Sequence, residues 1–233
     1  MSKLFLSCCS ALLFAFNASG EETALTLGYA EFPPFTYTNN KNQADGVLFK
    51  KAQQVILEVG YQLTPLALPT KRLKKYIASG KVDLWLGIKP SNELKALVIA
   101  GKQQVGTVLL NIYALTDQKT TQLSDLNGKR LIVIRGYSYG GAIDYIRDKN
   151  NHISIEITND HESAFSMLAK GRADYLLAYQ QPSQLALQHV KINNVTVNKL
   201  FELPVFFIVS KQVSNAKDLI AKLDQALLKI CEE

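Results

Sequence analysis

Three basic residues lie where predicted secondary-structure elements begin or end. Arg72 falls in the first turn of a predicted helix, Lys89 follows a predicted strand, and Arg135 ends another. A cation in the first turn of a helix opposes the helix dipole, which favours a role for Arg72 in contacting an anion. Charge-assisted hydrogen bonds from such groups bind carboxylates strongly. The three residues therefore predict an anionic ligand, with plain solvation of each side chain as the alternative.

Phe32 stands on a loop that two prolines stiffen. It is flanked by Glu31 on one side and by Pro33 and Pro34 on the other, directly after a predicted strand over residues 24–29. Proline restricts the backbone, so an aromatic ring on such a loop can stack on a ligand at little ordering cost. The alternative is a phenylalanine that fills the core beneath the loop.

Gly136, Tyr137 and Ser138 lie where a predicted strand meets the start of a helix. Free backbone N–H groups at such a junction, together with the serine hydroxyl, can hold an anion. Ordinary capping of the helix by Ser138 is the alternative.

The segment over residues 136–140 also matches the G-x-S-x-G pattern of serine hydrolases, in the strand-to-helix context that this pattern needs. A catalytic triad would need an acid and then a histidine downstream of Ser138, and Asp174 and His189 come in that order, with His161 as another candidate. However, Asp174 opens a predicted strand instead of following one, and no histidine comes after the last strand. A serine hydrolase therefore stays a rival to a binding protein.

The elements that must position these residues alternate between strands and helices. The segment Ile77–Leu86 is echoed by Leu168–Leu177, since each reads as a helix end, a glycine, a basic residue, an aspartate and an apolar strand. This echo predicts two similar α/β lobes, each a small, mostly parallel sheet flanked by helices. Ligands of such sheets bind beyond the carboxyl ends of the strands, so we expect the site in the cleft between the lobes.

The composition argues against nucleic-acid binding, and the N-terminal residues predict that the protein is exported. The chain has 233 residues, 26 Lys+Arg against 20 Asp+Glu, and a net charge of +6, a bias too weak to predict nucleic-acid binding. Lys3, an apolar run over residues 4–16 and small residues up to Gly20 are typical of a secretory signal peptide over residues 1–20. No metal-binding spacing and no phosphate-binding loop is present in the sequence. We expect an exported product without a cofactor.

Five segments together resemble a known family. They are LGYAEFPPFTY (Leu27–Tyr37), DGVLFKKA (Asp45–Ala52), SGKVD (Ser79–Asp83), DLNGKRLIVIRGYSYG (Asp125–Gly140) and KGRADYLLA (Lys170–Ala178). In their order and spacing they resemble the bacterial extracellular solute-binding proteins of family 3, the periplasmic receptors of polar amino-acid ABC transporters.

The resemblance implies a type II periplasmic-binding fold, in which two segments cross between the lobes, here near residues 106–111 and 198–204. The signal peptide would cover residues 1–20, the first lobe residues 21–108 and 200–233, and the second lobe residues 109–199. The family resemblance also implies that the ligand is trapped when the two lobes close about a hinge.

The resemblance further implies roles for individual residues. Phe32 takes the family's stacking position, and Tyr137 and Ser138 take its carboxylate-binding positions. Lys95 stands where the family has a carboxylate-clamping arginine, so the charge is kept but the bidentate fork is lost. Tyr179 stands where the family has an aspartate that accepts the ligand's amino group, and a tyrosine offers no charge to pair with an ammonium.

The sequence thus predicts a solute-binding protein that serves an ABC transporter or a membrane sensor. The ligand is small and polar, either anionic or amino-acid-like, with charge contacts from the three basic residues and hydrogen bonds from Tyr137, Ser138 and Tyr179. Two enzymatic alternatives remain. One is the serine hydrolase, and the other is a dehydratase on the same fold with Glu31 as its acid and base.

Overall fold

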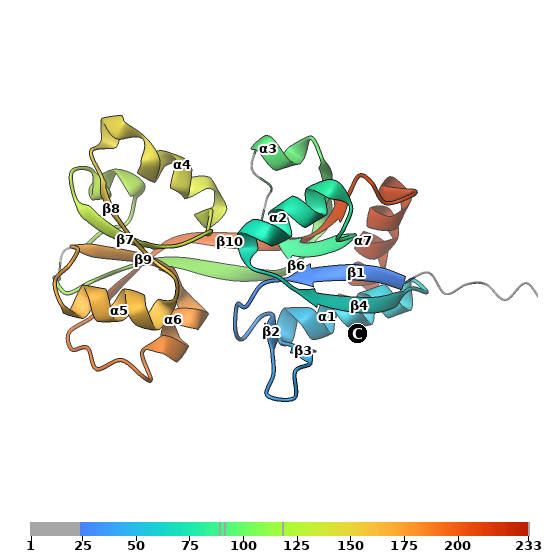
Figure 1. Ribbon diagram of the computed structural model, residues 1–233, viewed down its shortest axis with the longest axis horizontal. Helices are drawn as coiled ribbons and strands as arrows, with labels where there is room; N and C mark the ends of the chain where they lie inside the picture. Colours follow the sequence, from blue (N-terminus) through green and yellow to red (C-terminus); the bar gives the residue numbers. More distant parts are fainter. Residues whose placement is uncertain (1–23, 89, 91, 118, 233) are drawn as a thin grey trace, which may run out of the picture.

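The computed structural model describes residues 24–88, 90, 92–117 and 119–232. The predicted signal peptide and Lys89 lie outside these residues. An eight-stranded sheet runs through the molecule in the order β4-β1-β5-β10-β6-β9-β7-β8, with helices on both of its faces (Figure 1). Within the described residues, no helix combines the length and the apolar composition needed to cross a bilayer.

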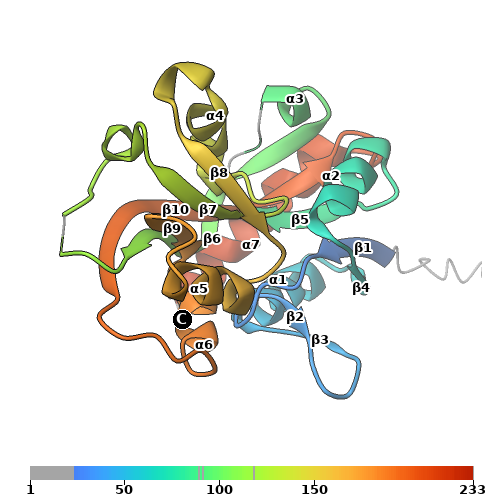
Figure 2. The ribbon, with the colours of Figure 1, turned by 60° about the vertical axis from the view of Figure 1, so that its left-hand side comes forward.

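The sheet has two ends, which we call the first and the second lobe. The first lobe holds β1 (Ala24–Tyr29), β4 (Gln62–Ala67) and β5 (Leu84–Gly87), with α1 (Val47–Glu58), α2 (Thr70–Ser79), α3 (Asn92–Lys95) and α7 (Ala216–Glu232). The second holds β7 (Arg130–Ile134), β8 (Ser154–Thr158) and β9 (Tyr175–Tyr179), with α4 (Ala142–Arg147), α5 (His161–Ala169) and α6 (Gln180–Ala186). A small hairpin of β2 (Tyr37–Thr38) and β3 (Ala44–Asp45) extends from the first lobe, and short 3-10 turns cover Leu123–Leu126, Tyr139–Gly141 and Lys149–Asn151. Figure 2 shows α4 on one face of the second lobe's strands and α5 and α6 on the other.

Two long strands, β6 (Val98–Ala114) and β10 (Thr196–Ser210), run through both lobes as an antiparallel pair. The crossing segments predicted near residues 106–111 and 198–204 lie inside these strands and pair with each other, for example Val108 with Leu203. β10 contains Pro204, which the sheet accommodates next to a break in the strand register between Val205 and Phe206. The lobe limits at residues 108/109 and 199/200 stay a prediction.

The internal echo in the sequence corresponds to a repeated structural joint. Asp83 precedes β5, and its carboxylate accepts a hydrogen bond of 2.8 Å from the backbone N–H of Thr26 in β1. Asp174 precedes β9, and its carboxylate accepts one of 2.9 Å from the backbone N–H of Arg130 in β7. In both lobes, therefore, the aspartate ties the strand after a helix to the first strand of the lobe, at the edge of the sheet away from the strands' carboxyl ends.

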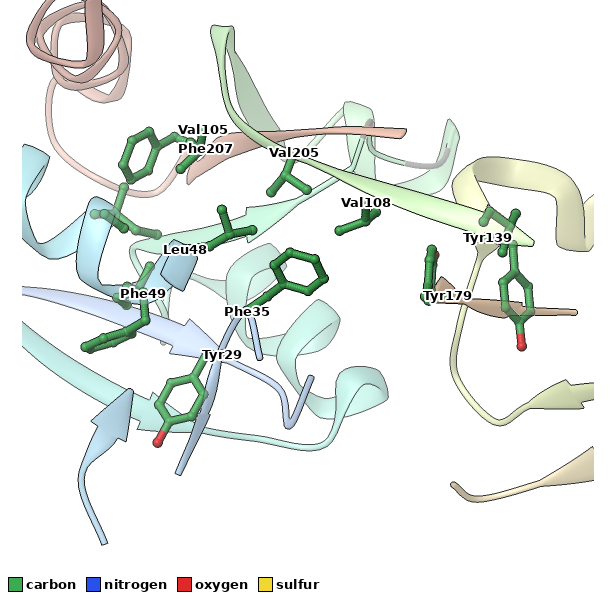
Figure 3. Packing of buried hydrophobic residues seen from close by; sticks show 14 of the residues in the cluster. Tyr29, Phe35, Leu48, Phe49, Val105, Val108, Tyr139, Tyr179, Val205 and Phe207 are labelled. Carbon is green, nitrogen blue, oxygen red and sulfur yellow. The ribbon is translucent and has the colours of Figure 1, made fainter. Parts of the chain in front are cut away.

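The largest group of buried apolar residues extends from the first lobe along the crossing strands into the second. Figure 3 shows Phe35, Leu48, Val108 and Val205 gathered on the first-lobe side, with Tyr179 facing them from the second lobe. The space between these two groups is where the candidate site lies.

Candidate functional site

A cavity of about 110 Å³ lies between the lobes, where the carboxyl ends of the strands meet. Its lining comes from the loops after β1 and β7, from β5 and the residue after it, from the last residue of β9, from the starts of α1 and α2 and from the two crossing strands. The residues that line it are Ala30, Phe32, Phe35, Thr36, Leu48, Thr70, Lys74, Trp85, Leu86, Gly87, Ile88, Val108, Tyr137, Ser138, Tyr179 and Val205. Four of the residues that the sequence predicted for the site are among them, namely Phe32, Tyr137, Ser138 and Tyr179.

Phe32 joins the two lobes through its aromatic ring. Its ring centroid lies 5.9 Å from that of Tyr137 and 5.1 Å from that of Tyr179, both edge-on, and 5.4 Å from that of Phe35 in a stacked arrangement. Edge-on aromatic pairs contribute roughly 0.5–1.5 kcal/mol each beyond their buried area. Because Tyr137 and Tyr179 belong to the second lobe, these contacts hold the cleft closed.

The loop that carries Phe32 is fixed by its own hydrogen bonds. The backbone N–H of Phe32 donates to the carbonyl of Thr36 over 2.7 Å, and the N–H of Phe35 donates to the carbonyl of Phe32 over 2.9 Å. The hydroxyl of Thr36 donates to the carbonyl of Ala30 over 2.9 Å. The ring of Phe32 is thus presented to the cavity by a backbone that is already ordered.

Three tyrosines meet on the second-lobe side of the cavity. Burial raises the pKa of the phenols of Tyr137, Tyr139 and Tyr179, so all three stay protonated at neutral pH. The hydroxyl of Tyr139 accepts a hydrogen bond of 2.6 Å from the backbone N–H of Ile134. The phenol of Tyr179 is hydrogen-bonded to the backbone of Tyr139. Tyr179 therefore contributes mainly its ring to the cavity, and Tyr137 has the phenol that is free to serve a ligand.

Lys74 is the cation that lines the cavity, and sequence reasoning missed it. Burial lowers the pKa of its ammonium, a shift that Glu93 and Asp144 partly offset and Arg147 reinforces. Lys74 lies next to the buried stripe formed by Leu73 and Ile77 of α2, whereas Arg72 points into solvent. The sequence could have shown that Lys74 lies on the buried face of this helix. Positions i, i+3, i+4 and i+7 share one face of a helix, and here they are Thr70, Leu73, Lys74 and Ile77.

Glu31 and Arg135 lie outside the cavity lining. The Glu31 carboxylate accepts hydrogen bonds from the backbone N–H of Thr38 over 3.1 Å and from its hydroxyl over 2.6 Å, and the residue is exposed. Arg135 is exposed as well, and its Nε donates to the side-chain oxygen of Asn159 over 3.0 Å. Each side chain thus has a partner on its own lobe.

Arg72 and Lys95 are also exposed and do not line the cavity. Gly136 stands at its rim with a φ of 86°, where a Cβ would come within 3.5 Å of the Cβ of Thr70 in the opposite lobe. Lys89 lies outside the described residues, although Ile88 before it lines the cavity. Of the predicted charge contacts, those of Arg72, Lys95 and Arg135 therefore do not reach the cavity.

The structure assembles no catalytic triad around Ser138 among the described residues. Ser138 has an ordinary right-handed backbone, with φ −96° and ψ −13°, and not the strained turn of a nucleophile elbow. Asp174 lies at the other edge of the sheet in a 2.8 Å ion pair with Arg130, and His189 is exposed. His161 packs on the Tyr137 ring at 5.9 Å, and its Nε2 is buried without a hydrogen-bond partner.

The dehydratase alternative depends on Glu31, whose carboxylate accepts a hydrogen bond from the Thr38 hydroxyl and is not part of the cavity lining. In the part of the chain that the structure describes, no three His, Cys, Asp or Glu side chains gather where they could hold a metal ion.

Comparison with known proteins extends these observations. Neither a protein-family model nor a curated protein sequence matches the chain. Solved structures match it over most of its length, with sequence identities between 17% and 20%.

A histidine kinase sensor domain with similarity to periplasmic binding proteins is 17% identical, with a TM-score of 0.75, over 90% of this chain and 90% of that chain. An ancestral arginine-binding protein bound to arginine is 19% identical, with a TM-score of 0.72, over 90% and 93%. The substrate-binding protein of an amino acid ABC transporter is 18% identical, with a TM-score of 0.68, over 90% and 93%. The chain therefore has the two-lobed α/β fold of the periplasmic binding proteins, as its sequence predicted.

Proposed function

We propose that this protein is an exported solute-binding protein that captures a small ligand by closing its two lobes. The observation that supports this most is the cavity between the lobes, which is lined by Phe32 of the first lobe and by Tyr137 and Tyr179 of the second. Ligand-binding sites occur preferentially at such interfaces. A micromolar affinity needs about −8.2 kcal/mol, which a buried aromatic wall and a charge-assisted contact can supply.

The crossing strands β6 and β10 provide the hinge in this proposal. They connect the lobes, which also meet through the Phe32 contacts and through the approach of Gly136 to Thr70. A bound molecule adds contacts to both lobes in the closed form alone, so it shifts the population toward closure.

The protein then acts by binding and performs no chemistry of its own. The unstrained backbone of Ser138 and the ion pair of Asp174 with Arg130 support this view, as does the hydrogen bond that ties Glu31 to Thr38. The signal-peptide pattern over residues 1–20 supports a periplasmic location.

The closed form would present both lobes to an inner-membrane partner, either an ABC permease or a sensor protein. Both settings occur among proteins of this fold, one a transporter's binding protein and one a kinase sensor domain. We expect a monomer that binds no nucleic acid.

A thermal-shift screen tests ligand capture. The purified protein is screened against amino acids, monocarboxylates, dicarboxylates, polyamines and small sugars. A ligand that binds the folded state at 100 times its Kd adds about 2.7 kcal/mol. For a chain of this size the melting temperature should then rise by roughly 5 °C or more. The rise should disappear in Phe32→Ala and persist in Phe201→Ala, which removes an exposed ring outside the cavity lining.

Failure of every compound class to raise the melting temperature of a cooperatively unfolding sample would contradict ligand capture. An equal rise in wild type and Phe32→Ala would place the binding site elsewhere.

A further inference from the structure

Most side chains that line the cavity are apolar, whereas a strongly hydrated solute needs hydrogen-bonding groups around it. Its lining includes the apolar side chains of Phe32, Phe35, Trp85, Ile88, Val108 and Val205. A sugar or a dicarboxylate placed against these side chains would lose hydrogen bonds to water that the walls do not replace. The cavity therefore favours a ligand whose body is apolar.

Only one charged side chain lines the cavity among the described residues, and it is Lys74. Within that part of the chain, no carboxylate lies within ion-pair distance of its Nζ, and burial lowers the pKa of the ammonium. Glu93 and Asp144 act on Lys74 only without a direct ion pair, so an anion that enters the cavity stabilises its charged form further. Ser138 and Tyr137 add hydroxyls on the opposite wall.

The described lining offers no carboxylate to pair with a cationic group of a ligand. None of the described lining residues is an aspartate or a glutamate. Tyr179 is neutral, since burial raises the pKa of its phenol, and it is bonded to the backbone of Tyr139. An ammonium or guanidinium would be buried here beside the like charge of Lys74 and without a carboxylate to pair with, which costs several kcal/mol.

The size of the cavity limits the ligand further. An apolar cavity of about 150 Å³ takes up benzene, whereas drug-sized ligands occupy about 300–1,000 Å³. The 110 Å³ found here fits a molecule of benzene size or smaller in the closed form.

We propose that the ligand is a small monocarboxylate with an apolar body and no ammonium group, and that Lys74 binds its carboxylate. This inference rests on the proposed function, because it assumes that the closed cleft is the binding site. It makes Lys74 the residue that selects for an anion, and the ring of Phe32 the surface on which the ligand body lies.

The chain offers its own reporter for the test. Trp85 is the single tryptophan of the 233 residues, and it lines the cavity. Binding can therefore be followed by Trp85 fluorescence and confirmed by calorimetry. The probes differ only in their head group: butyrate, butyramide, butylamine and 2-aminobutyrate, with benzoate, benzamide and benzylamine as a larger set. Arginine, glutamine and phenylalanine are titrated in parallel.

We expect the carboxylates to bind at least tenfold more tightly than the matching amides, amines and amino acids. Hydrogen bonds to charged groups correspond to about 10- to 100-fold in affinity, so Lys74→Met should weaken carboxylate binding by that factor. Lys75→Met removes a neighbouring exposed charge of the same helix and should change the affinity less than twofold.

Two results would overturn the inference. In one, an amino acid or an amine binds more tightly than its carboxylate counterpart, which leaves ligand capture intact and refutes the ligand class. In the other, carboxylates bind Lys74→Met as well as wild type, which refutes the role of Lys74. Failure of the carboxylates together with every class in the thermal-shift screen would instead refute ligand capture itself.

Discussion

His161 brings a titratable ring into the interior of the second lobe. It begins α5 and lies on the ring of Tyr137, with its Nε2 buried and unpartnered. Burial lowers the pKa of the imidazole from 6.5 to about 4, a shift that Asp160 partly opposes. The neutral ring is therefore the form that the fold accommodates.

This burial predicts a loss of stability in acid. Below pH 6.5 the unfolded chain binds a proton at His161 that the folded chain does not, so stability falls as the pH drops from 6.5 to about 4. The full loss is about 3 kcal/mol. In urea unfolding between pH 4 and 7, His161→Phe should lose this slope. His189→Phe, at an exposed histidine, should keep it. A slope that survives in His161→Phe would assign the acid sensitivity to other groups.

At this scale the sequence predicted the aromatic and hydroxyl side chains of the cavity better than its charges. Phe32, Tyr137, Ser138 and Tyr179 follow strands whose ends could be read from apolar runs, so their place at one edge of the sheet follows from the topology. The sequence pointed to Arg72 because a cation in the first turn opposes the helix dipole, but the face of the helix on which a residue lies decides which groups its side chain can contact. On the face of α2 that lines the cavity stands Lys74.

At the scale of elements, the repeated aspartate joint accounts for the similarity of the two lobes. Asp83 and Asp174 each accept a backbone N–H from the first strand of their lobe. A hydrogen bond to a charged acceptor contributes roughly 1.5–3 kcal/mol. The joint therefore supplies a notable share of the stability of each lobe.

Removal of the first-lobe joint should be measurable. Asp83→Ala leaves the N–H of Thr26 without its acceptor, so we expect the free energy of unfolding to fall by about 1.5–3 kcal/mol in urea titrations. Asp117→Ala, in an exposed loop, should change it by less than about 0.5 kcal/mol. Equal stability of the two variants would show that the joint is dispensable.

The strands that cross between the lobes were predicted only in part. The crossing segment expected near residues 106–111 is only the second part of β6, which begins at Val98, because the polar stretch over residues 101–104 hides the first part. The segment expected near residues 198–204 lies in a strand that continues past Pro204, since pairing with β6 on one side outweighs the missing N–H. Such long-range pairing is not encoded in local hydrophobic patterns.

At the scale of the whole molecule, the two lobes bring two stretches of backbone together beside the cavity, at Thr70 and Gly136. A Cβ at Gly136 would lie 3.5 Å from the Cβ of Thr70, which falls within the range of disulfide-bonded pairs. This contact joins the start of α2 to the loop after β7 and exists only while the lobes are together.

The double variant Thr70→Cys/Gly136→Cys, in a background without the natural cysteines, should therefore form a disulfide under oxidation. The cross-link would hold the cleft shut and block exchange of a bound ligand. A matched control is Thr70→Cys/Gly141→Cys, because a Cβ at Gly141 meets nothing within 4 Å. Cross-linking is read from gel mobility and thiol titration. Equal cross-linking of both variants would contradict a defined closed state.

The route of the chain through the sheet also sets the order in which the molecule can be completed during synthesis. β5 pairs with β10, and α7 packs against the same lobe, so the first lobe needs residues from both ends of the chain. The strands β7, β8 and β9 of the second lobe are contiguous in sequence and can pair as soon as they have been made. The half that is synthesised first is thus finished last, and a chain truncated before Thr196 leaves β5 with an open edge.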